Sequence, residues 1–167
     1  MSMLQRLNSG HVVWEAKEGA CGSLSPGVIR KLSSWSQKRF CSKEAGGLIL
    51  GFVDIDTNGL LAEELTVPGP GDQRSRTSFF RSERHQREAE LWNMQTNGKG
   101  TQLGLWHTHP EANPTPSSTD LSDCERVLRN GRFDCNGLLY LIVGTQTIGC
   151  WHAQAGRPLS LLGHFKP

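Results

Sequence analysis

The chain has 167 residues, the length of one domain with a sizeable core. Its formal net charge of +2 gives no reason to expect nucleic acid or a membrane surface as a partner. Neither a signal-peptide core nor a run near the roughly 20 apolar residues of a membrane span is visible. Five cysteines without a Cys-x-x-Cys pair predict no structural zinc site or redox pair, and a reducing, cytoplasmic setting is expected.

The first half of the chain predicts one helix and one hairpin. Ser25 followed by Pro26 is typical of a helix N-terminus, and apolar residues at helical spacing predict an amphipathic helix over 26 to about 38. Strand-length runs cover residues 11–16, 44–53 and 60–67. The run over 44–53 is apolar and rich in glycine, which favours a core strand, and a turn at 56–59 connects it to its return strand.

The second half predicts further alternating elements. Helix-forming runs cover residues 83–95 and 119–129, and strand-length runs cover 77–81, 102–108, 138–144 and 147–153. Ser118 or Thr119 is expected to cap the second helix, and a proline-rich loop over 110–116 precedes it. Several hairpins and few βαβ units predict a fold of α/β composition and α+β type, with a mixed, mostly antiparallel sheet flanked by helices.

The most informative segment is 107–120, which reads His-Thr-His-Pro-Glu-Ala-Asn-Pro-Thr-Pro-Ser-Ser-Thr-Asp. Because side chains alternate along a strand, His107 and His109 point to the same side and can share a tetrahedral metal ion. The stiff proline-rich loop can bring the next helix back over the strand, with Asp120 in its first turn as a third ligand. Three protein ligands and an open fourth position are typical of catalytic zinc, so the segment predicts a hydrolase.

The same residues also have other interpretations. A histidine can be an ordinary core or surface residue, Asp120 an ordinary first-turn residue, and Ser117 a turn or cap residue. Residues 109–111 read His-Pro-Glu, the first half of a nucleobase-deaminase motif, but the Pro-Cys-x-x-Cys that this chemistry also needs is missing. No His-Glu-x-x-His occurs, which excludes the common helix-borne protease site.

The motif resembles that of the JAMM zinc metallopeptidases, also called JAB/MPN+ domains. Their pattern is an upstream Glu, then His-x-His, seven residues, Ser, two residues and Asp. The resemblance implies five site residues: the zinc ligands His107, His109 and Asp120, the oxyanion-stabilising Ser117, and the general base Glu44. Glu44 opens the stretch Glu-Ala-Gly-Gly-Leu-Ile-Leu-Gly, which is similar to the family's Glu-x-x-Gly-x-Leu-x-Gly strand.

Two other acids compete with Glu44 for the role of base. Glu63 and Glu64 lie on the return strand, without the glycine-rich context. The resemblance covers roughly residues 26–153. It implies one JAB/MPN domain over residues 1–167, with a cytidine-deaminase-like fold around a curved sheet and one Zn²⁺ per chain.

The surroundings of the motif are similar to a prokaryotic branch found beside E1- and E2-like conjugation proteins in CBASS antiphage operons. The resemblance implies an isopeptidase or peptidase for a ubiquitin-like or conjugated protein with an extended C-terminal tail, such as a cGAS-like nucleotidyltransferase. Residues 68–81 and 112–116 are expected to line the groove for that tail. The basic stretch 74–87 is expected to be mainly a solvated surface. Alternatives are a peptidase for a sulfur-carrier protein in biosynthesis and a non-catalytic MPN scaffold.

Overall fold

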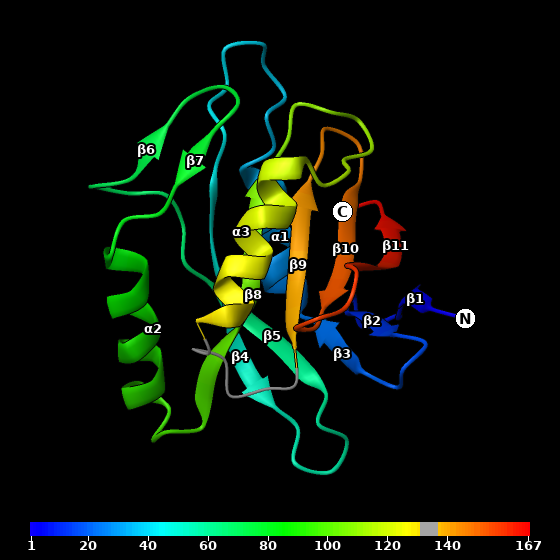
Figure 1. Ribbon diagram of the computed structural model, residues 1–167. Coiled ribbons are helices and arrows are strands. Elements are labelled where there is room, and N and C mark those ends of the chain that lie inside the picture. Colours follow the sequence, from blue (N-terminus) through cyan, green and yellow to red (C-terminus); the bar gives the residue numbers. More distant parts are fainter. Residues whose placement is uncertain (131–136) are drawn as a thin grey trace.

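The computed structural model describes residues 1–130 and 137–167 (Figure 1). The strands of its main sheet are β1 (Met3–Arg6), β2 (Val12–Glu15), β3 (Cys21–Leu24), β4 (Gly46–Val53), β5 (Leu60–Leu65), β8 (Gly100–Thr108), β9 (Leu138–Val143), β10 (Ile148–Ala153) and β11 (Ser160–Phe165). Their order is β1-β2-β3-β5-β4-β8-β9-β10-β11. Only β3 with β5 and β8 with β9 pair in parallel among these described strands, so the predicted mixed, mostly antiparallel sheet is confirmed.

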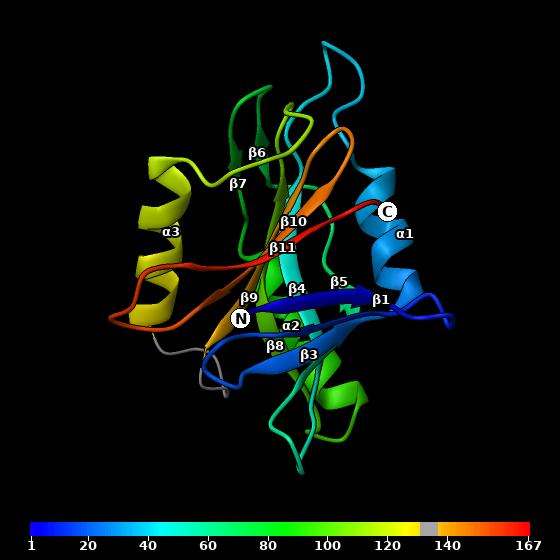
Figure 2. The ribbon, with the colours of Figure 1, turned by 90° about the vertical axis from the view of Figure 1, so that its right-hand side faces the viewer.

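Helices cover both faces of this sheet (Figure 2). Helix α1 (Pro26–Ser34) packs on one face, whereas α2 (Arg84–Gln95) and α3 (Ser118–Arg129) pack on the other. Each face has its own hydrophobic core, and consecutive residues of β8 belong to different ones: Leu105 to the core under α2 and α3, Trp106 to the core under α1. The alternation along β8 therefore sets which of its side chains face α3.

The start of α1 agrees with the sequence and its end does not. Ser25 caps the helix by accepting a hydrogen bond from the Val28 N–H at 3.2 Å. The helix ends at Ser34, earlier than predicted. The chain turns inward after that residue because the buried side chain of Gln37 accepts a hydrogen bond from the Thr108 hydroxyl of β8, at 2.7 Å.

Three strands of the sheet escaped the sequence analysis, namely β1, β3 and β11. They are short or lack a clean alternation of apolar residues, so periodicity did not reveal them. The predicted strand over 77–81 is the two-residue strand β7 (Phe79–Phe80), which pairs with β6 (Gln73–Arg74) in a separate small hairpin. The outermost strands β1 and β11 contact each other, which curves the sheet toward a barrel. None of the helices in the described residues is long and apolar enough to cross a membrane.

Candidate active site

The carboxyl end of β8 is held on both sides by its neighbours. His107 lies opposite Gly46 of β4, and the backbone N–H of His109 continues the pairing with β9 at 3.0 Å. Thr108, between the two histidines, is fully buried. Its N–H donates to the carbonyl of Ala45 and its hydroxyl accepts from the Ala45 N–H, both at 2.9 Å. The two imidazoles therefore leave a firmly held backbone toward the same face.

The carboxylate of Asp120 meets both imidazoles. Its Oδ1 lies 3.2 Å from Nε2 of His107, and its Oδ2 lies 3.1 Å from Nε2 of His109. The two Nε2 atoms are 3.0 Å apart. The structure thus brings together the three residues that the sequence analysis predicted as zinc ligands.

The position of Asp120 follows from how α3 begins. Ser117 is the N-cap: its Oγ accepts from the Asp120 N–H at 3.1 Å, and its N–H donates to Oδ2 of Asp120 at 2.7 Å. The predicted cap at Ser118 or Thr119 is wrong, because the acidic partner of a capping box stands three residues after the cap, and only Ser117 has Asp120 there. The hydroxyl proton of Ser117, which the cap does not use, is free to donate into the cavity that this residue lines.

The donor atoms of these three residues suit a zinc ion. Ligand atoms at about 2.0–2.2 Å from a tetrahedral zinc ion are about 3.3–3.5 Å apart. The two Nε2 atoms are 3.0 Å apart and each lies 3.1 or 3.2 Å from one of the two Asp120 oxygens, so only a small opening is needed to match. Nδ1 of His109 is buried without a hydrogen-bond partner in the described residues, and its nearest acid is Glu111 at 3.6 Å. Two imidazoles and one carboxylate leave a fourth position for a water molecule.

The pKa shifts within the cluster bear on its ability to bind a metal ion. Burial lowers the pKa of His107, which favours the neutral imidazole that a metal ligand requires. Burial acts in the same direction on His109, but the hydrogen bond and charge of Asp120 outweigh it and raise the pKa of His109. Burial alone would raise the pKa of Asp120, yet hydrogen bonds from both histidines hold it well below its usual range.

Glu44 stands at the edge of this cluster. The predicted strand began at Glu44, but β4 begins at Gly46. The N–H of Glu44 instead donates to the carbonyl of Ser75 at 2.7 Å. Its carbonyl accepts from Nε of Arg74 at 2.8 Å. A carboxylate oxygen of Glu44 lies within 4.8 Å of a nitrogen of each of the two histidines. Only 6% of Glu44 is exposed, and burial raises its pKa to about 7.

The two glycines after Glu44 permit this close packing. A Cβ on Gly46 would lie 2.6 Å from the Phe79 ring, and a Cβ on Gly47 would lie 2.2 Å from the carbonyl oxygen of Thr66. A side chain at either position would push away the hairpin or the segment after β5. The glycine-rich context that drew attention to Glu44 therefore has a steric cause.

The competing acids lie elsewhere. Glu63 is exposed, and Glu64 forms an ion pair with Lys31 of α1. Neither residue lines the cavity that contains Glu44. Glu44 is therefore the acid of this group that the fold places beside the histidines.

A cavity of about 970 Å³ opens over the site and runs along α3. Its wall includes Thr77–Arg81 of the hairpin segment and, farther along α3, Arg126 and Asn130. Residues 112–116, which were expected to share in a groove for an extended tail, are not part of its lining.

The basic stretch 74–87 is less solvated than predicted. Arg74 bonds to backbone carbonyls before β4, Arg81 pairs with Asp123 of α3 at 3.4 Å, and Arg84 pairs with Asp72 at 3.1 Å. The prediction of a mainly solvated surface is wrong for these three, which hold the hairpin segment against its surroundings.

A curved mixed sheet with a buried cluster of histidines and carboxylates at one end defines a hydrolase domain of α+β type. The chain belongs to the prokaryotic homologues of the JAB domain, whose family model matches residues 25–154. This agrees with the JAMM resemblance of the motif. A solved solution structure of a protein from Desulfitobacterium hafniense has the same fold, with a TM-score of 0.56 and 21% identity over 83% of this chain and 87% of that one.

Three curated relatives share one name. A protein of Escherichia coli named CD-NTase/cGAS isopeptidase is 33% identical over 72% of this chain and 74% of its own length. Proteins of the same name from Pseudomonas aeruginosa and Vibrio cholerae are 40% and 31% identical. The Pseudomonas match covers 63% of this chain and 65% of that protein, and the Vibrio match covers 70% and 72%.

Proposed function

We propose that this protein is a zinc-dependent isopeptidase that releases a cGAS-like nucleotidyltransferase from proteins to which its C-terminal tail is joined. The observation that carries the proposal is the convergence of His107, His109 and Asp120 beside the buried carboxylate of Glu44, in one open cavity. The names of the curated relatives support the substrate class.

Each site residue has a defined task in this proposal. His107, His109 and Asp120 hold the metal. Zinc, when bound, supplies a Lewis acid that lowers the pKa of a water molecule and polarises the carbonyl of the substrate. Glu44 takes a proton from the attacking water and passes it to the leaving amine, a task for which a pKa of about 7 is well matched.

Ser117 stabilises the charge that develops on the carbonyl oxygen. Its Oγ is already an acceptor for the Asp120 N–H, so its hydroxyl proton points elsewhere and can be donated to the oxyanion. The attack by water is direct, and no acyl-enzyme forms. The buried Cys124 is not needed as a nucleophile, and burial raises its pKa to about 11, which keeps it a thiol.

The proposed partners follow from the substrate. A conjugated nucleotidyltransferase requires E1- and E2-like proteins that make the conjugate, and this protein would reverse their reaction in antiphage defence. The cavity along α3 is the proposed binding site for the extended tail.

The experiment that tests the function is cleavage of a purified conjugate between a cGAS-like nucleotidyltransferase and a lysine-containing target protein. Mass spectrometry of the products identifies the broken bond. The proposal expects an intact nucleotidyltransferase with a free C-terminal carboxylate and a target with a free lysine amine. Cleavage at another bond, or cleavage that persists in excess chelator, would contradict it.

A further inference from the structure

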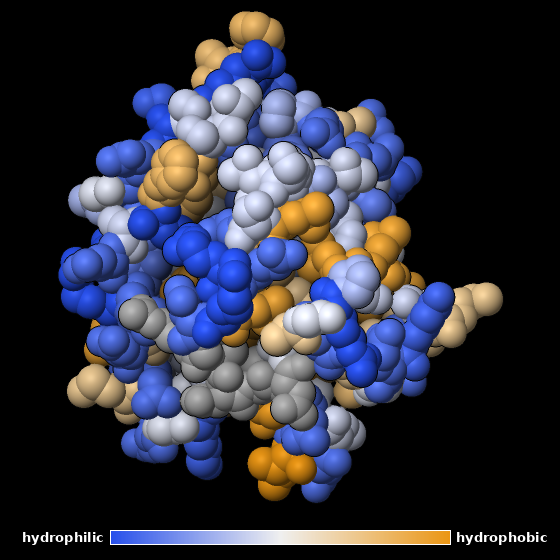
Figure 3. Space-filling model, viewed as in Figure 1, coloured by the Kyte–Doolittle hydropathy of each residue, from blue (hydrophilic) through white to orange (hydrophobic). Residues whose placement is uncertain are grey.

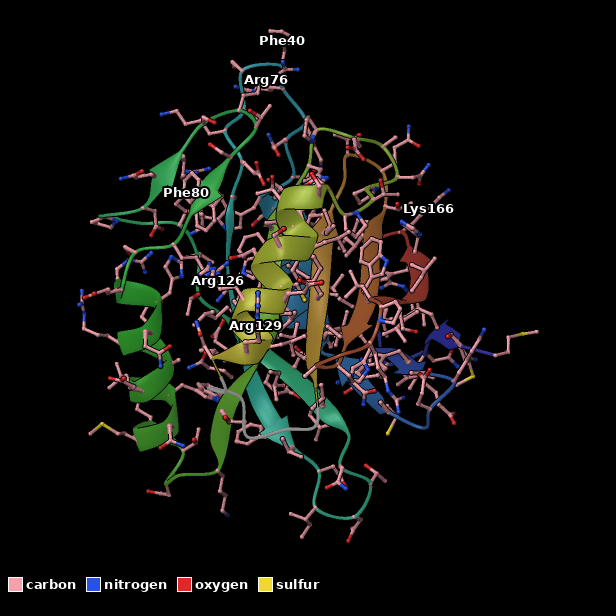
Figure 4. All side chains as sticks on the ribbon, viewed as in Figure 1. Phe40, Arg76, Phe80, Arg126, Arg129 and Lys166 are labelled. Carbon is pink, nitrogen blue, oxygen red and sulfur yellow. The ribbon has the colours of Figure 1, made fainter. Side chains whose placement is uncertain are left out.

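One exposed cluster beside the site takes no part in the chemistry described above. The loop between α1 and β4 approaches the turn between β6 and β7 at one end of the molecule, where Phe40 and Arg76 lie side by side (Figure 4). Five exposed residues make up this basic tip: Lys38, Arg39, Phe40, Lys43 and Arg76. Figure 3 shows a hydrophobic group standing out at the same end, with hydrophilic side chains beneath it.

The aromatic ring of the tip is unusually open. Phe40 is 81% exposed, and the only side chain stacked on it in the described residues is that of Arg76, whose Cζ lies 3.9 Å from the ring centroid. Covering a solvent-exposed phenylalanine with a partner removes apolar surface from water and so favours binding. Aromatic residues and arginines are the side chains that most often dominate protein–protein interfaces.

The tip is also strongly and uniformly basic. Residues 36–43 and 73–81 contain no acidic residue. None of the four cations of the tip forms an ion pair with an acid anywhere in residues 1–130 or 137–167. Arg74 and Arg81, in the same hairpin segment, do have partners, whereas the four cations of the tip do not pair with an acid of the described residues.

The backbone under the tip is held in place. The buried amide of Gln37 donates to the carbonyls of Ser42 and Arg76, at 3.2 and 2.9 Å, and so joins the loop to the hairpin turn. The same amide accepts from the Thr108 hydroxyl, between the two histidines of the site. Lys43 is the residue before Glu44. A preorganised surface loses less entropy on binding. The tip is connected to the site through Thr108 of β8 and through Glu44.

The tip lies at the end of the cavity where the site is, since Lys43 and Arg76 directly precede Glu44 and Thr77 of the cavity lining. Helix α3 begins at the site and runs away from the tip toward Arg126 and Arg129, with the cavity along it (Figure 4). A conjugate has a protein on each side of the cleaved bond. If the tail lies in the part of the cavity along α3, the protein released from it extends past the site at the other end, where the tip is.

We infer that the basic tip docks an acidic surface of the protein on the leaving-group side of the cleaved bond. The inference rests on the proposed isopeptidase function and adds a preference among conjugates: those whose leaving protein is acidic near the linkage are cleaved faster. The attraction is between exposed charges, so it weakens at high salt.

The test uses one tail sequence with three leaving groups. The C-terminal tail of a cGAS-like nucleotidyltransferase is joined to aminomethylcoumarin, to an acidic variant of green fluorescent protein, or to a basic variant of it. The variants are Lys38→Glu with Arg39→Glu, and Phe40→Ala. The control is Lys99→Glu with Arg157→Glu, which changes the net charge equally at exposed positions away from the tip.

Wild type and control should cleave the acidic fusion with a kcat/KM at least about 10-fold above that of the basic fusion, and 0.5 M NaCl should remove the difference. The Lys38→Glu, Arg39→Glu variant should lose the preference and Phe40→Ala should reduce it, and both should still cleave the coumarin peptide within about twofold of wild type. An unchanged preference in the tip variants would overturn the inference.

Binding of the same fusions to Glu44→Gln protein separates the docking inference from the proposed function. If wild type cleaves none of the fusions, and the acidic fusion still binds through the tip, the proposed function is wrong and the docking inference stands. If cleavage occurs but binding ignores the charge of the leaving protein, the docking falls. Tighter binding of a DNA duplex than of the acidic fusion, lost in the tip variants, would also overturn it.

Discussion

The buried carboxylate of Glu44 should destabilise the metal-free protein at neutral and alkaline pH. Its pKa is raised by burial from an ordinary value of 4.5 to about 7, although His109 opposes the rise. Below about pH 4.5 the group is protonated in both the folded and the unfolded chain, so there is no penalty. Between the two pKa values the unfolded chain ionises and the folded one resists, and above about pH 7 the penalty is complete.

The size of the penalty follows from the two pKa values. At 1.36 kcal/mol per pKa unit, the difference between 4.5 and about 7 corresponds to about 3 kcal/mol. The carboxylate faces an open cavity, which reduces the figure to about 2 kcal/mol. No group in the described residues donates a hydrogen bond to this carboxylate through its side chain or backbone, so Glu44→Gln loses little when the acid is already neutral.

The assay is urea unfolding of wild type and Glu44→Gln in excess chelator, from pH 5 to pH 8.5. The variant should be more stable than wild type by only about 0.5 kcal/mol at pH 5 and by about 2 kcal/mol at pH 8.5. The exposed Glu63→Gln is the matched control, because it makes the same chemical change outside the cavity. A variant that is less stable than wild type at pH 8.5 would refute the reasoning.

Three further predictions concern the supports of the site. Ser117→Ala should lower kcat about 10²–10³-fold and the free energy of unfolding by about 1 kcal/mol. Ser117→Thr should retain most of the activity and of the stability. Steady-state kinetics measures kcat, and urea titration measures the free energy of unfolding. Arg74→Ala should lower kcat by about 10-fold with unchanged zinc content, because Arg74 holds the carbonyl of Glu44; a parallel loss of zinc would instead indicate a general collapse of the site. His85→Ala should cost about 3 kcal/mol of stability, because it removes a hydrogen bond of 2.9 Å from the buried Asp72, and a loss below 1 kcal/mol would show that water replaces the imidazole.

The sequence revealed the parts of the fold that follow a simple rule. The alternation of side chains was enough to place His107 and His109 on one face, because β8 pairs without a register shift with both neighbours from Gly104 onward. Helix α1 was found from the spacing of its apolar residues and its cap at Ser25. The glycines after Glu44 were informative because a Cβ there collides with the backbone or a ring.

Other features depend on contacts between distant parts of the chain. The end of α1 is set by the burial of Gln37 against Thr108, which no local pattern encodes. The cap of α3 could have been found from sequence, since Ser117 and Asp120 have the spacing of a capping box. The partners of Arg74 and Arg81 could not, because a run of arginines has the same appearance whether its charges are paired or free.

The basic tip illustrates the same limit. Neither residues 36–43 nor residues 73–81 form a recognisable motif on their own. They become one surface because Gln37 bonds to the carbonyl of Arg76 and Arg74 bonds to the carbonyls of Lys43 and Glu44, and Arg76 then stacks on Phe40. A surface assembled from two loops is visible only in the folded protein.

The central claim is that one zinc ion and Glu44 together activate water in this site. The most direct measurement is the rate of conjugate cleavage by chelator-treated protein as zinc is added back in known amounts. The rate should rise linearly and stop rising at about one zinc ion per chain, and Glu44→Gln should show no activity at any zinc concentration. Full activity without added zinc, or wild-type cleavage by zinc-loaded Glu44→Gln, would contradict it.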